Sequence, residues 1–149
     1  MKTETYALEE VGLQGFQLVK SQYFARQVDP VMTLWETAVS FGTAAYAALD
    51  KCEFVNVYVD YDKRKILIKP TTSKDPDAIK WIKNMDKPAS VRLECTLFAR
   101  HVFEAWKYDK SFRYRTYGKL VQSDKKVMLL FDFTSPEVWK GQKMVRENG

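Results

Sequence analysis

The stretch FVNVYVDYDKRKILIK, residues 54–69, decides the fold predicted for this chain. Across residues 54–60 three valines alternate with other side chains, which is the two-residue period of a strand with one face on a core. Residues 60–63 favour a turn, and residues 64–69 alternate again with two isoleucines pointing inward. The stretch therefore predicts a β-hairpin.

The segments on either side of this hairpin predict short elements. Residues 31–35 are apolar enough for a strand that residues 38–41 continue, and the alanine-rich residues 43–49 favour a helix. After the hairpin, the triplet Asp75-Pro76-Asp77 combines a helix-capping residue with a proline suited to a first helical turn. A helix from there through about Asn84 is expected.

The second half of the chain repeats this order of elements, although its residues differ from those of the first half. Residues 90–95 predict a strand, and residues 96–106 a helix with apolar side chains at helical spacing. Residues 112–121 and 127–133 predict a second hairpin, and residues 134–137, Thr-Ser-Pro-Glu, predict the start of a last helix.

The predicted fold class is α+β: an antiparallel sheet covered by helices, built from two pseudo-repeated β-α-β-β(-α) units. The units span about 31–84 and 90–145 inside one domain of residues 1–149. A chance recurrence of a common element order is the alternative. Residues 15–20 alternate weakly and predict an edge strand.

Length and composition set broad limits on the class of protein. With 46% hydrophobic and 29% charged residues, the chain is ordinary for a globular protein. Its apolar runs are far shorter than a membrane helix needs, and the first residues lack the apolar core of a signal peptide. The cytoplasm is the expected compartment.

The positive charge of the chain is concentrated in one segment. The formal net charge is +5, and residues 1–91 and 127–149 each contain equal numbers of basic and acidic side chains. Residues 92–126 hold nine Lys or Arg against four Asp or Glu, which is the whole excess. The location of the charge is therefore more informative than its size.

The strand predicted within that segment places cations and an aromatic ring on one side by the two-residue period. Such a row can contact phosphates while the ring stacks on a base, and Gly118 would permit close approach. The alternative is a solvated face whose arginine stems lie along apolar neighbours. The first hairpin carries cations in the corresponding place, which favours function, although edge lysines also prevent aggregation. The candidate nucleic-acid-binding residues are Arg113, Arg115, Tyr117, Lys119, Lys63, Arg64, Lys65 and Lys69.

Residues 38–49, AVSFGTAAYAAL, followed by the hairpin at 54–70, resemble the swapped-hairpin family of bacterial transition-state regulators. In that family a short apolar strand leads into a helix ending in Leu and then into a hairpin with alternating valines, and tandem members of similar length are known. Glu36-Thr37 stands where the family has Gly-Arg, so the family's arginine is not carried over. The chain is also similar in style to uncharacterised prophage and mobile-element proteins, and a Whirly-type fold is a rival relative.

No constellation for catalysis or metal binding is evident. His101 falls on a predicted helix beside Arg100, where a histidine is more often structural, and no glycine-rich phosphate loop occurs. Cys52 and Cys95 are isolated in the sequence, which favours reduced thiols over a disulfide. A single histidine and no close pair of cysteines disfavour a structural zinc site. The tryptophans at 81, 106 and 139 fall on predicted helices and are expected to fill the core or a dimer contact.

The expected function is therefore nucleic-acid binding without catalysis or cofactor, by a bacterial or mobile-element DNA-binding regulator. Whether the DNA is single- or double-stranded stays open. A homodimer is the candidate assembly, because small sheet domains often complete their cores across a twofold axis. The alternative is a protein-interaction or inhibitory module, which would expose a large apolar patch.

Overall fold

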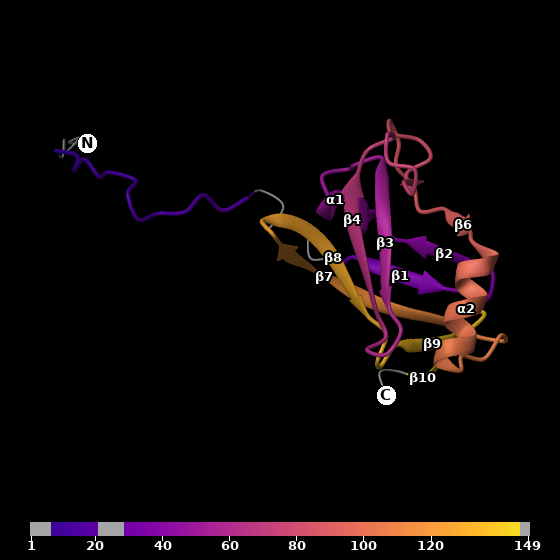
Figure 1. Ribbon diagram of the computed structural model, residues 1–149. Helices are drawn as coiled ribbons and strands as arrows, with labels where there is room; N and C mark the ends of the chain where they lie inside the picture. Colours follow the sequence, from indigo (N-terminus) through magenta and orange to yellow (C-terminus); the bar gives the residue numbers. More distant parts are fainter. Residues whose placement is uncertain (1–6, 21–28, 147–149) are drawn as a thin grey trace.

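Antiparallel strands are the main regular structure of the chain in the computed structural model, which describes residues 7–20 and 29–146 (Figure 1). The strands are β1 Val31–Leu34, β2 Ala38–Phe41, β3 Phe54–Asp60, β4 Lys65–Thr71, β5 Ile79–Lys80, β6 Arg92–Glu94, β7 Arg113–Ser123, β8 Lys126–Asp132, β9 Glu137–Lys140 and β10 Lys143–Arg146. The helices are α1 Thr43–Ala48 and α2 Thr96–Trp106.

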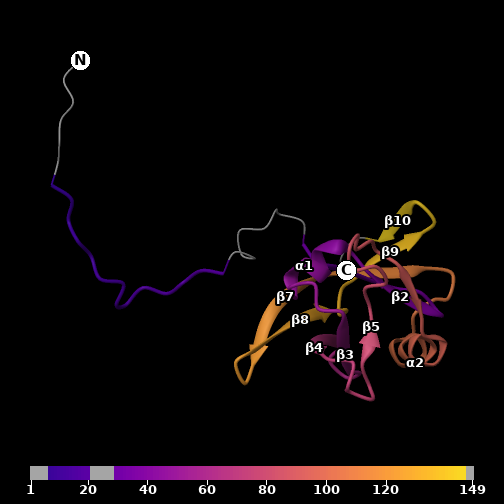
Figure 2. The same ribbon diagram turned by 90° about the horizontal axis from the view of Figure 1, so that it is seen from above.

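The strands form one sheet in the order β5-β3-β4-β8-β7-β1-β2-β6, with β9 beside the start of β7 and β10 beside β9. The sheet curls into a half-barrel. In Figure 1 β3 and β4 cross in front of β1 and β2, and Figure 2, seen from above, shows these two layers joined through β7 and β8. The curl creates an inner side between the layers and an outer side facing away from it.

The predicted α+β class is wrong, because the described chain has only two short helices and is mostly antiparallel β. No helix follows Asp75. Its carboxylate accepts hydrogen bonds from the Asp77 N–H, from Asn56 on β3 and from Thr71, which fold the segment into a turn against the sheet. Residues 79–80 then pair with β3 as β5. Asp75 accepts hydrogen bonds as a helix-capping residue would, but these bonds stabilise a turn rather than a helix.

The predicted last helix is also wrong, because residues 137–146 form the β9–β10 hairpin. Its turn contains Gly141 at φ 61°, a conformation that glycine adopts without strain. Val138 points inward, and β9 pairs with the first residues of β7. The edge strand expected at residues 15–20 is absent as well: the structure assigns no strand within residues 7–20.

Several predicted elements are confirmed. Residues 54–69 form the β3–β4 hairpin, with Val55, Ile66 and Ile68 fully buried. The helix predicted to run through Trp106 is present as α2, with Cys95 rather than Thr96 at its N-cap, and the second hairpin is β7–β8. These are the segments in which a long, regular hydrophobic period was available.

Equivalent elements of the two halves are paired with one another. The order strand, helix, strand, strand occurs as β2-α1-β3-β4 and again as β6-α2-β7-β8. β2 pairs with β6, and β4 pairs with β8, both antiparallel. This pairing is what a pseudo-twofold arrangement would produce, while duplication of a single ancestral unit stays a prediction.

Aromatic side chains fill the space between the two layers. The Phe41 ring on β2 lies 5.2 Å from that of Trp81 and 5.9 Å from that of Phe131 on β8. The indole N–H of Trp81 donates to the Cys52 carbonyl at 2.6 Å, and that of Trp106 donates to the Tyr61 carbonyl at 2.9 Å. Both tryptophans are buried, so of the two predicted roles, core and dimer contact, they fill the core, although Trp81 does not lie on a helix.

The strand β7 belongs to both layers, and Gly118 marks the change of partner. Residues before it pair with β1 and β9, whereas residues 118–123 pair with β8. A Cβ at Gly118 would lie 2.6 Å from Cε1 of the buried Phe131 ring, so only glycine fits without rearrangement. Among the described residues, neither helix is long and apolar enough to cross a membrane.

Candidate nucleic-acid interface

The two helices pack on the inner side of the sheet and leave its outer side without a covering helix. On α1, the Tyr46 ring packs 4.9 Å from Trp81, and on α2, the Phe103 ring packs 5.6 Å from Tyr114 of β7. Side chains of β7 alternate between the two sides, with Tyr114 buried and Tyr117 47% exposed. The four candidate residues of β7 lie on the outer side.

Three arginines on this outer side lie over aromatic rings, and they are the three such cation–π pairs found in the part of the chain that the structure describes. The guanidinium carbon of Arg92 lies 4.1 Å from the centre of the Trp35 ring, and the corresponding distances are 5.2 Å from Arg113 to Trp139 and 5.6 Å from Arg115 to Tyr117. We call these six residues the arginine–tryptophan face.

The pairs are held together by adjacent strands rather than by one loop. Arg113 of β7 lies directly opposite Trp139 of β9, and β7 pairs on its other edge with β1. Trp35 follows the last residue of β1, and Arg92 lies on β6 opposite Ser40 of β2. Aromatic and cationic side chains therefore alternate across the β9, β7, β1 and β6 strands.

Arg115 lies two residues after Arg113 on β7 and points to the same side of the sheet. Its strand neighbours are Glu137 on β9 and Thr33 on β1, both 7% exposed. The Glu137 carboxylate accepts the Trp139 indole N–H at 3.0 Å. Arg115 Nε is buried and has no hydrogen-bond partner among the described residues. The Arg115 guanidinium is thus fixed by packing more than by hydrogen bonds at this atom.

A shallow hollow adjoins this end of the face. It has a volume of about 520 Å³, and it is lined by Arg115 and Tyr117 together with Asp29, Val31 and residues 42–44. A cation and an exposed ring on one wall suit a group that carries both negative charge and a flat surface. Asp29, which also lines the hollow, would repel an anion placed against it.

The cations of the first hairpin lie on a different part of the outer side. Lys65 and Lys69 are on β4, two strands away from Lys119 on β7, whereas Lys63 and Arg64 are in the β3–β4 turn. Because the sheet curls, β4 lies in the layer opposite to β1 (Figures 1 and 2). The structure therefore does not bring these four residues onto the arginine–tryptophan face.

The surroundings of Lys65 reduce its availability to an anion. It lies between Asp60 on β3 and Asp132 on β8, which are its direct neighbours across the sheet. Burial opposes ionisation of Asp132, but hydrogen bonds from Thr134 and the charges of Lys65 and Lys119 outweigh it and lower its pKa. Lys65 is thus already engaged electrostatically.

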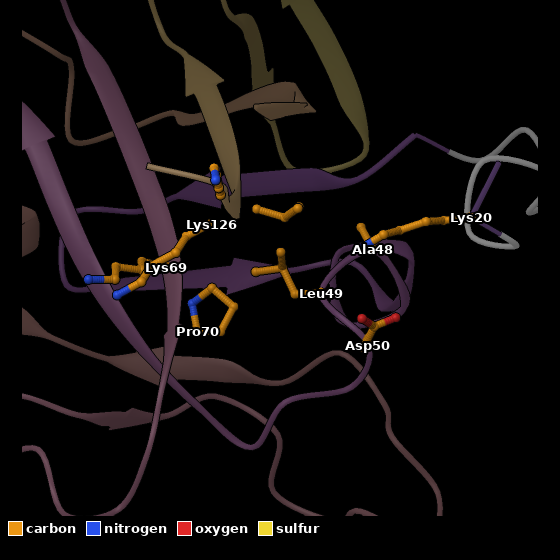
Figure 3. A pocket seen from close by; sticks show the side chains of 9 residues that line it. Lys20, Ala48, Leu49, Asp50, Lys69, Pro70 and Lys126 are labelled. Carbon is orange, nitrogen blue, oxygen red and sulfur yellow. The ribbon is translucent and has the colours of Figure 1, made fainter. Parts of the chain in front are cut away.

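A second hollow, of about 400 Å³, opens beside Lys69 (Figure 3). Figure 3 shows Lys69 and Lys126 on its sheet side and Asp50 beyond the end of α1, and Lys20 and Lys125 also line it. No buried side-chain atom that lacks a partner in the described chain belongs to its lining. We assign no ligand to it.

The remaining chemical candidates are dispersed. His101 is exposed on α2 and stacks on Tyr61, with ring centres 4.8 Å apart. Burial raises the pKa of Cys52 to about 11 and also raises that of Cys95, so neither thiol is activated. Within residues 7–20 and 29–146, no three His, Cys, Asp or Glu side chains gather closely enough to hold a metal ion.

Sequence reasoning missed half of the arginine–tryptophan face. Trp139 was predicted to lie on a helix and to fill the core or a dimer contact, yet it lies on the outer side of β9. Trp35 and Arg92 are 57 positions apart in the chain, and only the β2–β6 pairing brings them together. The alternation of Val138 with its neighbours was the one local signal of a strand here, but Pro136 favoured the prediction of a helix start instead.

In comparisons with protein-family models, curated proteins and solved structures, nothing matched this chain, so the interface rests on its geometry.

Proposed function

We propose that this protein binds single-stranded nucleic acid in the cytoplasm through the arginine–tryptophan face, without catalysing a reaction. The observation that carries the proposal is the set of three arginines stacked on aromatic rings across one helix-free sheet surface. Arg113, Arg115 and Tyr117 of the sequence-predicted set belong to it, and Trp35, Arg92 and Trp139 extend it.

Stacking orders an arginine for binding. A guanidinium that lies over a ring has lost most of its rotamer freedom, so less entropy is lost when it meets a ligand. Its second planar face can stack on a base, while its N–H groups reach phosphate oxygens. Arg113 is held further by a hydrogen bond to the Gly141 carbonyl. Three arginines fixed in this way form a preorganised surface for a ligand with alternating bases and phosphates.

The shape of the face favours unpaired bases over a duplex. The major groove of duplex DNA admits a helix or a two-stranded ribbon, whereas the arginine–tryptophan face is the broad side of a sheet. Bases of a single strand can instead stack on exposed rings, and Tyr117 is 47% exposed. The duplex form and RNA are therefore comparison ligands for the test.

The test compares binding of labelled single-stranded and duplex oligonucleotides by fluorescence anisotropy as salt is raised. We expect Arg113→Ala/Arg115→Ala to weaken single-strand binding at least about tenfold and to reduce the salt slope by about 0.7 per lost phosphate contact. Lys74→Ala/Lys83→Ala, which removes two exposed cations from outside the face, is the matched control. Equal effects of the two double variants, or no binding by the wild type at low salt, would refute the proposal.

Tryptophan fluorescence supplies a second readout that is independent of charge. Trp35 and Trp139 lie on the face, whereas Trp81 and Trp106 are buried. A single strand stacked on the face should quench part of the emission, and Trp35→Phe/Trp139→Phe should abolish that quenching. Quenching that persists in this variant would place the nucleic acid elsewhere.

A further inference from the structure

The hollow of about 520 Å³ beside Arg115 lies on the outer side of the sheet, where it is also lined by the exposed ring of Tyr117. Val31 of β1 is the strand neighbour of Tyr117, and the Gly42 N–H donates to the Val31 carbonyl at 2.9 Å. These contacts bring three segments that are distant in sequence to one place. Asp29 and the first residues of α1 also line the hollow, which we call the Arg115 hollow.

The apolar part of the lining is kept open by a glycine. A Cβ at Gly42 would come within 2.9 Å of Val31 Cγ1, so a side chain at position 42 would crowd Val31 in the lining. The volume of the hollow falls within the range of about 300–1,000 Å³ that is typical of ligand sites, which combine apolar surface with a few polar groups. The polar groups therefore decide which ligand fits.

The two charged side chains of the hollow do not neutralise each other. Within the described residues no ion pair joins the Asp29 carboxylate to the Arg115 guanidinium, although both line the hollow. The Glu137 carboxylate beside Arg115 accepts the Trp139 indole N–H, and the buried Nε of Arg115 has no hydrogen-bond partner in the same part of the chain. The hollow thus presents a donor group and an acceptor group that are both available to a ligand.

This combination favours a nucleobase over a phosphate as the occupant. A phosphate has only acceptor oxygens and carries negative charge, so it suits Arg115 but is repelled by Asp29. A base is uncharged and flat, and its edges carry both donors and acceptors. Its face can stack on the Tyr117 ring while its edges meet the two charged groups.

Among the bases, guanine matches the two groups most completely. Its O6 and N7 atoms accept the paired N–H groups of an arginine, which is the commonest base-specific contact. Its N1–H and N2 amino group are adjacent donors that suit the two oxygens of one carboxylate. Adenine and cytosine offer the carboxylate one amino group, and thymine offers it one ring N–H. Only guanine gives each group two hydrogen bonds.

We infer that the Arg115 hollow binds one guanine of the nucleic acid, so that the protein prefers single strands that contain this base. The inference rests on the proposed function, because the arginine–tryptophan face has to hold the strand for a base to reach the hollow. Arg115 donates to O6 and N7, Asp29 accepts from N1 and N2, and the base lies against Tyr117. Arg113 does not line the hollow and is left to contact phosphates.

Fluorescence anisotropy with single strands of equal length tests the preference. The strands consist of thymidine and differ at one central position, which holds guanine, adenine, cytosine or thymine. We expect the guanine strand to bind at least about tenfold more tightly than the all-thymidine strand. Inosine, which lacks only the N2 amino group, and 7-deazaguanine, which lacks the N7 acceptor, should each lose at least about fivefold of that affinity.

Asp29→Ala separates recognition of the base from general electrostatics. It should abolish the difference between guanine and inosine, because the partner of the N2 amino group is gone. Affinity for the all-thymidine strand should stay the same or rise, because a carboxylate is removed from a basic protein. Asp62→Ala is the matched control: it removes an exposed carboxylate from the β3–β4 turn, outside the hollow, and should keep the guanine preference.

Equal binding of the four strands by the wild type would overturn the inference, and so would a difference between guanine and inosine that survives in Asp29→Ala. Both aspartates are exposed, so neither substitution disturbs the folded core. The two proposals fail in different ways. Binding of the all-thymidine strand without any guanine preference refutes the guanine site and leaves the proposed function standing, whereas absence of binding to every strand refutes both.

Discussion

Replacing Gly118 by alanine tests whether the shape of the sheet depends on one close contact. The new Cβ would lie 2.6 Å from Phe131 Cε1 and 2.9 Å from Cδ1 and Cζ of the same ring. Carbon atoms normally approach to about 3.5 Å, so the ring or the strand must move by close to 1 Å. Phe131 is fully buried between the layers, so its ring cannot move into solvent to avoid the contact.

The expected cost follows from two opposing effects. Overpacking of a filled core destabilises by about 1–3 kcal/mol, whereas alanine restricts the unfolded chain and offsets about 0.4–1 kcal/mol. Gly118→Ala should therefore lower the free energy of unfolding by about 1–2 kcal/mol, measured by urea denaturation. Gly12→Ala, where no atom lies within 4 Å of the added Cβ, should be neutral.

A double-mutant cycle shows whether the Phe131 ring is the cause. Phe131→Leu removes the ring atoms that would clash, so Gly118→Ala should cost at least about 1 kcal/mol less in that background than in the wild type. An equal cost in both backgrounds would show that the strain arises elsewhere in β7. A neutral Gly118→Ala in the wild type would refute the packing argument itself.

Three further predictions concern single side chains. Asp75→Ala should destabilise the fold, whereas Asp77→Asn should not. Three hydrogen bonds lower the pKa of Asp75, so its contribution to stability is complete above the ordinary pKa of 3.8 and is lost as the pH falls below that value. Urea denaturation at several pH values measures this loss. With its pKa raised by burial to about 11, the Cys52 thiol should react with a disulfide reagent at pH 8 at least about a hundredfold more slowly than an ordinary thiol, and equal rates in the folded and unfolded states would contradict this. Trp106→Phe should cost about 1–3 kcal/mol by leaving the Tyr61 carbonyl without its donor, and a loss below about 0.5 kcal/mol would show that water replaces the indole.

The sequence predicted the elements whose signals are local and regular. The valines of β3 and the helical spacing in α2 were sufficient, because each pattern extends over seven or more residues. The segment after Asp75 failed for the opposite reason: an aspartate followed by proline suits a helix start and a turn equally well. What decided between them was Asn56 on β3, nineteen positions away, which donates to the Asp75 carboxylate.

The candidate interface was predictable only along a single strand. The two-residue period placed Arg113, Arg115 and Tyr117 together, since residues on one strand share a side regardless of the fold. Their partners depend on strand pairing. Trp139 and Trp35 come beside β7 through β9 and β1, on opposite edges of it, and local sequence carries no information about which strands become neighbours.

The pairing also explains why the two halves differ in surface chemistry. β3 and β7 occupy equivalent places in the repeated order, yet β3 has seven residues and β7 has eleven. The last six residues of β7 pair with β8 as β3 pairs with β4, while its first five pair with β1 and β9. Those first five contain Arg113, Arg115 and Tyr117. The arginine–tryptophan face is therefore built on the part of β7 for which β3 has no counterpart.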